Sequence, residues 1–261
     1  MTTGAGWPPG PSGTWVIDLD GVVWLAGEPI PGAAEAIGRL RRAGISPLFA
    51  TNNSAPTVDE LLARLARAGV PATPDDIVTS AQAAAVLVPA GATVLALADG
   101  GAVEALEERN ATVVEKGPAD VVLVGWTHHF DFDRLATAAT AVRNGARLLG
   151  TNEDPTHPTP GGLLPGAGAL LVAVATAAGV EPEVAGKPHR PMADLITARR
   201  SDVAVVVGDR PSTDGALARF LRAPFALVLS GVTAPGGPPP DPAPDVTADD
   251  LGALVDRFLG T

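Results

Sequence analysis

The chain has 261 residues, of which 46% are hydrophobic and 18% charged, and its formal net charge at pH 7 is -11. This is the composition of a globular protein with one or two domains, and the negative charge excludes nucleic acid as an expected partner, because phosphate-backbone binding depends on clustered lysine and arginine. The chain contains no cysteine, which excludes a disulfide framework and a thiolate zinc site.

The start of the chain predicts neither export nor membrane insertion. Residues 1–13 lack the basic start and apolar core of a signal peptide, and we expect them to form a flexible tail. No apolar run reaches the roughly 18 residues that a membrane span needs. We therefore expect a cytoplasmic protein without a membrane partner.

Short β-branched runs alternate with alanine- and leucine-rich stretches, which is the pattern of crossover units over a parallel sheet. Buried strands are predicted at 14–18, 45–50, 202–208 and 225–230. Helices are predicted over 32–44 and 57–69, each closed by a glycine, with Thr57 as the N-cap of the second. These elements predict an α/β fold.

The middle of the chain repeats the alternation, so residues 83–181 are predicted to form a second, smaller α/β domain. Its elements are strands at 93–98, 120–125 and 146–151, helices near 101–109 and 133–144, and a closely packed helix that opens within 165–170. The segment 234–244 is rich in proline and glycine, which predicts a loop before a last helix near 248–259.

Polar residues follow the predicted strands at the positions where open parallel sheets bind ligands. Asp18 and Asp20 follow the first strand, residues 51–54 (TNNS) the second, and residues 209–214 (DRPSTD) the third; Lys187 lies in a GKP sequence. Two carboxylates one residue apart oppose each other's ionisation unless a cation, or a reaction that needs both, accompanies them. We predict that these clusters converge on one crevice.

In order along the chain, these motifs resemble those of the haloacid dehalogenase (HAD) superfamily of phosphatases, and in detail its subfamily IIA with a C2-type cap. DLDGVVW, TNNS, GKP and GDRPSTD are similar to the family's first to fourth motifs, and residues 151–170 are similar to the subfamily's cap. The resemblance covers nearly the whole chain. It implies a Rossmann-like (HAD) parallel-sheet core, residues 14–82 and 182–261, with an inserted smaller α/β cap domain, residues 83–181.

The resemblance also implies a Mg²⁺-dependent phosphatase that hydrolyses a small-metabolite phosphomonoester through an aspartyl-phosphate. Asp18 would be the nucleophile, because covalent catalysis divides one slow step into two, and Asp20 would be the general acid and base. Asp18, the backbone carbonyl of Asp20, and Asp209 would hold the metal, since Mg²⁺ prefers hard oxygen ligands.

By the same resemblance, other motif residues would bind the transferred phosphoryl group. Thr51, Asn52 and Asn53 would donate hydrogen bonds to its oxygens. Lys187 would neutralise the charge of these oxygens and orient the nucleophile. Asp214 would support either the metal-bound waters or Lys187.

The predicted cap domain carries the question of which substrate is bound. Its loops 125–131 and 152–162 are expected to cover the mouth of the core site, and Asn152 and Asp154 are expected to fix the shape of the second loop. Three side chains of these loops are candidates for contact with the substrate: Trp126, His128 and His157. The alternative for the two histidines is that they are only solvated.

Several functions remain open at this point. A phosphatase of this fold has glycerol or sugar phosphates, phosphoglycolate, pyridoxal phosphate and nucleoside monophosphates as candidate substrates. A phospho-acceptor signalling domain is a different class, but Asp20 supplies the acid that turns a phosphoenzyme over. A nucleotide-binding module without catalysis is disfavoured by the absence of Walker and GxGxxG patterns. The resemblance further implies a homodimer through the caps.

Overall fold

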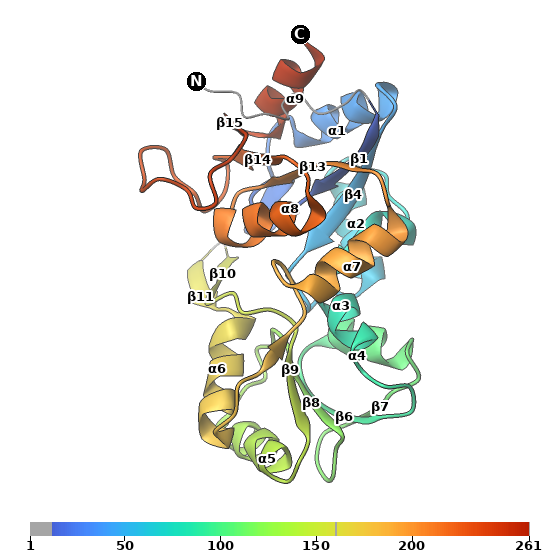
Figure 1. The fold of residues 1–261 in the computed structure, drawn as a ribbon, viewed down its shortest axis with the longest axis vertical. Helices are drawn as coiled ribbons and strands as arrows, with labels where there is room; N and C mark the ends of the chain where they lie inside the picture. Colours follow the sequence, from blue (N-terminus) through green and yellow to red (C-terminus); the bar gives the residue numbers. More distant parts are fainter. Residues whose placement is uncertain (1–11, 160, 261) are drawn as a thin grey trace. The chain divides into compact units, whose positions relative to one another are not determined.

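The structure is a computed structural model that describes residues 12–159 and 161–260. Most of the expected tail, residues 1–11, lies outside the described residues, and the first strand already begins at Gly13. The chain divides into two compact units, which are described here one at a time (Figure 1). Both contain parallel sheets with helices, so the predicted α/β fold class is confirmed.

The first unit comprises residues 1–51, 62–78 and 193–261, and the second comprises residues 52–61 and 79–192. Parts of the expected core lie in the second unit, namely residues 52–61, 79–82 and 182–192. Within this unit, Gly101 N donates to Ala55 O at 2.8 Å. The role of the insert as a cap stays a prediction.

The first unit is built on a six-stranded sheet with the order β15-β14-β13-β1-β4-β5. The strands are β1 (Gly13–Ile17), β4 (Ile45–Thr51), β5 (Ile77–Thr79), β13 (Val203–Gly208), β14 (Phe225–Val228) and β15 (Val246–Ala248). β1 is parallel to both of its neighbours, and Ile17 pairs with Phe49 and with Val207. Because parallel strands end at the same edge of a sheet, Asp18 and Asp209 follow their strands on one side of this unit.

The helices with residues in the first unit are α1 (Ala33–Arg42), α2 (Val58–Arg67), α7 (Arg190–Arg199), α8 (Ala216–Leu221) and α9 (Leu251–Leu259). The predictions of α1, α2 and α9 are confirmed, and Thr57 caps α2, since Glu60 N donates to Thr57 Oγ1 at 3.2 Å. α9 begins later than predicted because β15 occupies Val246–Ala248. The short hairpin of β2 (Trp24–Leu25) and β3 (Glu28–Pro29) was not predicted.

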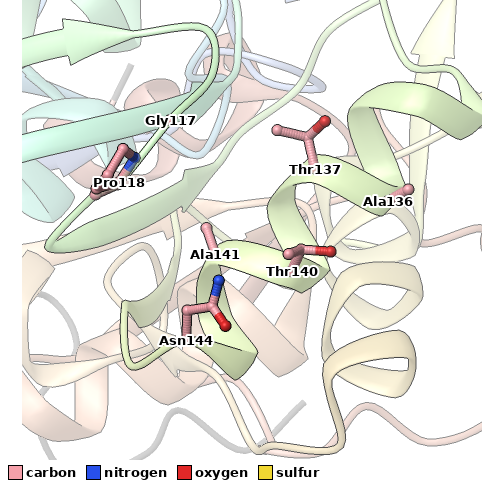
Figure 2. A pocket seen from close by; sticks show the side chains of 8 residues that line it. Gly117, Pro118, Ala136, Thr137, Thr140, Ala141 and Asn144 are labelled. Carbon is pink, nitrogen blue, oxygen red and sulfur yellow. The ribbon is translucent and has the colours of Figure 1, made fainter.

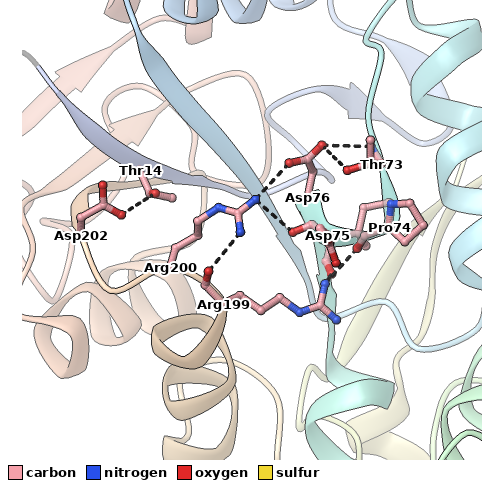
Figure 3. A network of polar contacts seen from close by, with 9 residues as sticks. Thr14, Thr73, Pro74, Asp75, Asp76, Arg199, Arg200 and Asp202 are labelled. Carbon is pink, nitrogen blue, oxygen red and sulfur yellow. Dashed lines mark hydrogen bonds and ion pairs between the residues drawn. The ribbon is translucent and has the colours of Figure 1, made fainter.

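A polar network fixes one end of the first unit's sheet (Figure 3). Arg199, at the end of α7, donates to the first carbonyl of the 3-10 turn Pro74–Asp76 at 2.9 Å, and Arg200 forms an ion pair with the last residue of that turn at 3.3 Å. The hydroxyl of Thr14 donates to Asp202 Oδ1 at 2.9 Å. Thr14 lies at the start of β1, so the network is at the opposite end of that strand from its catalytic candidates.

The second unit is built on a five-stranded parallel sheet with the order β12-β9-β8-β6-β7. Its strands are β6 (Thr93–Leu97), β7 (Thr112–Val114), β8 (Val121–Val124), β9 (Arg147–Gly150) and β12 (Glu183–Val184), and its helices are α3 (Ser80–Val86), α4 (Gly100–Glu107), α5 (Phe132–Arg143) and α6 (Ala167–Ala178). α5 and α6 lie next to each other (Figure 1) and form a core with the sheet through Leu97, Val124, Ala138, Leu171 and Val174.

The predicted loop 152–162 is only partly a loop. Residues 156–159 form β10 (Thr156–Thr159), which pairs antiparallel with β11 (Gly162–Pro165), so that His157 lies opposite Leu164. This hairpin was not predicted, because Pro158 lacks the backbone N–H that a strand uses. In the part of the chain that the structure describes, none of the helices has the length and apolar character needed to span a bilayer.

Candidate active site

Three buried carboxylates of the first unit come together: Asp18, Asp209 and Asp214. One oxygen from each lies within 4.8 Å of the others, and the three residues are 8%, 3% and 1% exposed. Aspartate is rarely buried unless a partner or a metal compensates its charge. Between residues 12 and 260, residue 160 excepted, this is the one group of acidic or histidine side chains with metal-ligand spacing. Hard oxygen ligands fit a cation such as Mg²⁺ or Ca²⁺.

The fold brings these carboxylates together through two strand ends and one turn. Asp18 follows β1 and Asp209 follows β13, as the sequence predicted. Asp214 lies in the π-helical turn Pro211–Gly215, and its Oδ2 accepts a hydrogen bond from Arg210 N at 3.1 Å. We expected only a supporting role for Asp214, but its carboxylate is close enough to those of Asp18 and Asp209 for all three to bind one metal ion.

The residues around Asp209 were missed by the sequence analysis. Val232 N donates to Asp209 Oδ2 at 2.6 Å, and the Thr233 hydroxyl donates to the Asp209 carbonyl at 2.5 Å. A β-carbon at Gly231 would lie 1.9 Å from Asp209 Oδ2, and one at Gly21 would lie 2.4 Å from it. Both positions therefore require glycine. The segment 230–233 directly follows β14, so the strand-end rule would have found it if applied to that strand.

Asp20 has a different environment from Asp18. It is partly exposed, and its Oδ1 accepts a hydrogen bond from the indole Nε1 of Trp24 at 3.1 Å. Its carboxylate is not part of the acidic cluster. The two carboxylates of the first motif are thus held by different groups, which suits different chemical roles.

Asn52 joins the second and third motifs within the second unit. Its Oδ1 accepts from Lys187 N at 2.7 Å, and its Nδ2 donates to the Lys187 carbonyl at 3.0 Å and to Asp154 Oδ2 at 3.1 Å. A side-chain amide has two N–H groups, and both are used here. Any hydrogen bond from Asn52 to a phosphoryl group must therefore come from its backbone, because its side chain fixes the buried Lys187 instead.

The backbone of Asn52 is held as firmly as its side chain. Its carbonyl accepts from Asn152 Nδ2 at 2.6 Å and from the Ser80 hydroxyl at 2.7 Å. Asp154 N donates to Asn152 Oδ1 at 3.1 Å, which confirms that these residues fix the shape of their own loop. The loop thus also braces the second motif, which the sequence analysis did not foresee.

The remaining residues of TNNS differ in exposure and partners. Thr51 is buried at the end of β4, and Asn53 is partly exposed, with its Oδ1 accepting from Ala55 N at 3.1 Å. Ser54 is fully buried, and its hydroxyl accepts from Trp126 N at 3.1 Å. Asn53 is therefore the side chain of this motif with most access to a ligand.

The three candidate specificity residues form one cluster in the second unit. The ring of Trp126 lies 4.5 Å from the ring of His128 and 4.8 Å from that of His157, measured between centroids. The indole Nε1 of Trp126 donates to the Pro165 carbonyl at 3.1 Å, which ties loop 125–131 to the end of the β10–β11 hairpin. Their part in binding a substrate stays a prediction.

The second unit also has a pocket of about 650 Å³ (Figure 2), formed by α5 and the loop that precedes β8. Its lining residues are Gly117, Pro118, Ala119, Ala136, Thr137, Thr140, Ala141 and Asn144. None of them has a side chain that titrates near neutral pH, so the pocket lacks groups for acid–base chemistry. It includes none of the predicted site residues.

We predict that Asn52→Leu lowers the free energy of unfolding by about 2–4 kcal/mol, because it leaves the buried backbone of Lys187 without its partners. Urea unfolding measures this change. The control is Asn144→Leu, at the exposed end of α5, for which we expect a change within about 0.5 kcal/mol. Equal effects of the two substitutions would contradict the assigned role of Asn52.

We predict that Gly231→Ala weakens binding of a divalent cation, because the new β-carbon displaces the Asp209 carboxylate. The expected loss of affinity is about 10- to 100-fold, the range found when groups that orient metal ligands are removed. Calorimetric titration with Mg²⁺ measures it. Gly38→Ala, the same change inside α1, is the control and should leave the affinity unchanged; equal affinity in both variants would show that the fit around Asp209 is not required.

Comparison with known protein families supports the order of the motifs. The family described as haloacid dehalogenase-like hydrolase matches residues 15–112, and a second family described as HAD-hydrolase-like matches residues 184–254. An acid sugar phosphatase of Staphylococcus saprophyticus is 37% identical over 207 residues, which are 77% of this chain and 80% of that protein. A D-glycerol 3-phosphate phosphatase of Mycobacterium tuberculosis is 40% identical over 225 residues, which are 83% of this chain but only 63% of that protein.

Solved structures give the same result. A glycerol phosphate phosphatase from Mycobacterium tuberculosis in complex with magnesium has a TM-score of 0.83 and 36% identity, over 92% of this chain and 75% of the other. A p-nitrophenyl phosphatase from Archaeoglobus fulgidus has a TM-score of 0.87 and 28% identity, over 94% and 98%. With its motifs at the predicted strand ends, the chain belongs to the haloacid dehalogenase-like hydrolases.

Proposed function

We propose that this protein is a Mg²⁺-dependent phosphatase that hydrolyses the phosphomonoester of a small metabolite, with glycerol phosphate and sugar phosphates as the first candidates. The observation that carries the proposal is the buried cluster of Asp18, Asp209 and Asp214, because buried carboxylates this close together favour binding of a cation. Support for the substrate class comes from the relatives, which are named for glycerol phosphate and acid sugar phosphates.

In the first step of the proposed reaction, a carboxylate oxygen of Asp18 attacks the phosphorus atom. The bond between phosphorus and the ester oxygen breaks, and Asp20 gives its proton to the departing alkoxide, so the alcohol leaves neutral. Asp18 now carries the phosphoryl group. The reaction needs one carboxylate that is a nucleophile and one that holds a proton. The different surroundings of Asp18 and Asp20 permit these two roles.

In the second step, Asp20 takes a proton from a water molecule. The water oxygen attacks the phosphorus atom, the bond to Asp18 breaks, and inorganic phosphate leaves. Mg²⁺ held by Asp18, Asp209 and the backbone carbonyl of Asp20, with Asp214 as a further oxygen donor, would offset the negative charge of the phosphoryl group.

In the proposed mechanism, the remaining motif residues bind the phosphoryl oxygens. Lys187 would neutralise their charge, and Thr51 and Asn53 would donate hydrogen bonds to them, together with the backbone N–H of Asn52. The clamp of the Asn52 side chain on Lys187 supports this assignment, because a group that stabilises charge must be fixed before the reaction begins. A homodimer through the caps and a cytoplasmic location stay predictions.

We predict that hydrolysis of phosphate esters requires Mg²⁺ and falls by ~10³-fold or more in Asp18→Asn, because the amide is not a nucleophile. Release of inorganic phosphate from a panel of metabolite phosphates, with Mg²⁺ or with chelator, measures both effects. Circular dichroism and thermal unfolding serve as the control for an intact fold.

The same experiment separates the proposal from its alternatives. A phospho-acceptor domain would take up about one phosphoryl group per chain and release no further phosphate, because it does not turn the phosphoenzyme over. Similar turnover by the wild type, by Asp18→Asn and by the enzyme in chelator would reject the proposed mechanism. Panel members should include phosphoglycolate, pyridoxal phosphate and a nucleoside monophosphate.

We infer further that the cluster of Trp126, His128 and His157 selects the leaving group, because the core motifs bind only groups that all phosphomonoesters share. Trp126→Ala, His128→Ala or His157→Ala should then change the relative kcat/KM among small phosphates by about 1–3 kcal/mol. The Mg²⁺ dependence should not change. Phe132→Ala, at a side chain that is 80% exposed, is the control. A uniform loss for every substrate would show that the cluster is not a specificity site.

A further inference from the structure

Trp24 has a polar contact that the proposed mechanism does not use. Its side chain is 4% exposed, and its indole Nε1 donates to Asp20 Oδ1 at 3.1 Å. A buried indole N–H normally finds a partner, but here the partner is the carboxyl group proposed to move the proton. This contact is unlike a packing contact, because it acts on a reacting group.

The backbone between the two residues holds this contact in place. Trp24 N donates to the Leu19 carbonyl at 3.1 Å, and Gly21 N donates to the Trp24 carbonyl at 2.6 Å. Trp24 also pairs with Pro29 in the β2–β3 hairpin. These bonds close the turn, and they hold Trp24 through both its backbone N–H and its carbonyl.

An indole N–H can donate a hydrogen bond but cannot accept one. Oδ1 of Asp20 can accept this bond whether Asp20 is a carboxylate or carries a proton, because a protonated carboxyl group keeps acceptor lone pairs. The contact therefore restricts rotation of the Asp20 side chain in both protonation states.

We propose that Trp24 is a positioning residue that holds the carboxyl group of Asp20 in the orientation from which it acts on the leaving group. The inference rests on the proposed function, since it assumes that Asp20 transfers a proton to the leaving group. It adds the residue that orients the acid, and it explains why the first motif ends in a large aromatic side chain.

The test is Trp24→Phe, which keeps an aromatic ring but removes the N–H. Protonation matters most for a poor leaving group, so kcat for an alkyl phosphate should fall roughly 10-fold, a part of the roughly 10²- to 10⁴-fold that general acid–base catalysis supplies. For 4-nitrophenyl phosphate, whose leaving group departs without a proton, we expect much less loss. KM should stay within about twofold for both substrates, since uniform binding is not changed.

The ratio of kcat values for the two substrates is the decisive quantity, because it does not depend on how much of the variant is folded. Trp15→Phe is the matched control: Trp15 is a buried indole in β1 that packs on Phe258 with ring centroids 5.0 Å apart. It should lower stability but leave the ratio unchanged. Trp24→Leu, which also lacks the N–H, provides a second variant with the same expected change in ratio.

Comparison of the single variants Asp20→Asn and Trp24→Phe with the double variant separates this inference from the proposed function. If Asp20→Asn itself changes both substrates equally, the acid–base role of Asp20 fails, and the role of Trp24 fails with it. If Asp20→Asn is selective for the alkyl phosphate, Trp24→Phe should have no further effect on the ratio in the double variant. An equal loss on both substrates in Trp24→Phe, or additive effects in the double variant, would overturn the positioning role alone.

Discussion

The mutual repulsion of Asp18, Asp209 and Asp214 is the constraint around which the first unit is organised. Three carboxylates within 4.8 Å of one another and nearly out of water repel one another, and a cation among them would offset this repulsion. The parallel sheet places two of them at adjacent strand ends, and the π-helical turn after β13 supplies the third. The backbones of Gly21 and Gly231 approach Asp209 closely and thereby restrict the position of its carboxylate.

In the second unit, the side-chain amide of Asn52 has the organising role that the three carboxylates have in the first. Asn52 meets both backbone groups of Lys187, and Asp154 takes its remaining N–H. A β-carbon at Gly186 would lie 2.7 Å from Asn52 Oδ1, so glycine is required next to the lysine. The GKP sequence is therefore explained by the approach of Asn52 as well as by the charge of its lysine.

The sequence could predict what depends on strand ends and periodicity. Asp18 and Asp209 were found because polar residues after buried strands mark the ligand-binding edge of a parallel sheet. The partners of Asn52 could not be found in this way, because a side-chain amide bonds to whichever backbone groups the tertiary structure brings to it. The same holds for Val232, whose contribution is a backbone N–H that carries no signature in the residue type. The hairpin of β10 and β11 was missed because proline and glycine hid its strand character.

The family resemblance filled part of this gap, since it assigned roles that spacing alone does not give. It did not, however, distinguish the backbone of Asn52 from its side chain, nor did it single out Trp24. Both distinctions depend on hydrogen-bond direction, which only atomic positions supply. Motifs therefore indicate the class of reaction, while the hydrogen-bond partner of each atom indicates which residue has which role.

The bracing of Asn52 by Asn152 and Asp154 has a consequence for how this chain can be recombined. The predicted insert, residues 83–181, contributes two residues that hold the second motif, so its exchange would alter more than the choice of substrate. A chimera that imports residues 83–181 from another protein must bring an amide and a carboxylate at these positions, or it will loosen the backbone that carries Lys187. Successful transfer of the insert is thus limited by hydrogen-bond compatibility with Asn52, even where the two sheets are preserved intact.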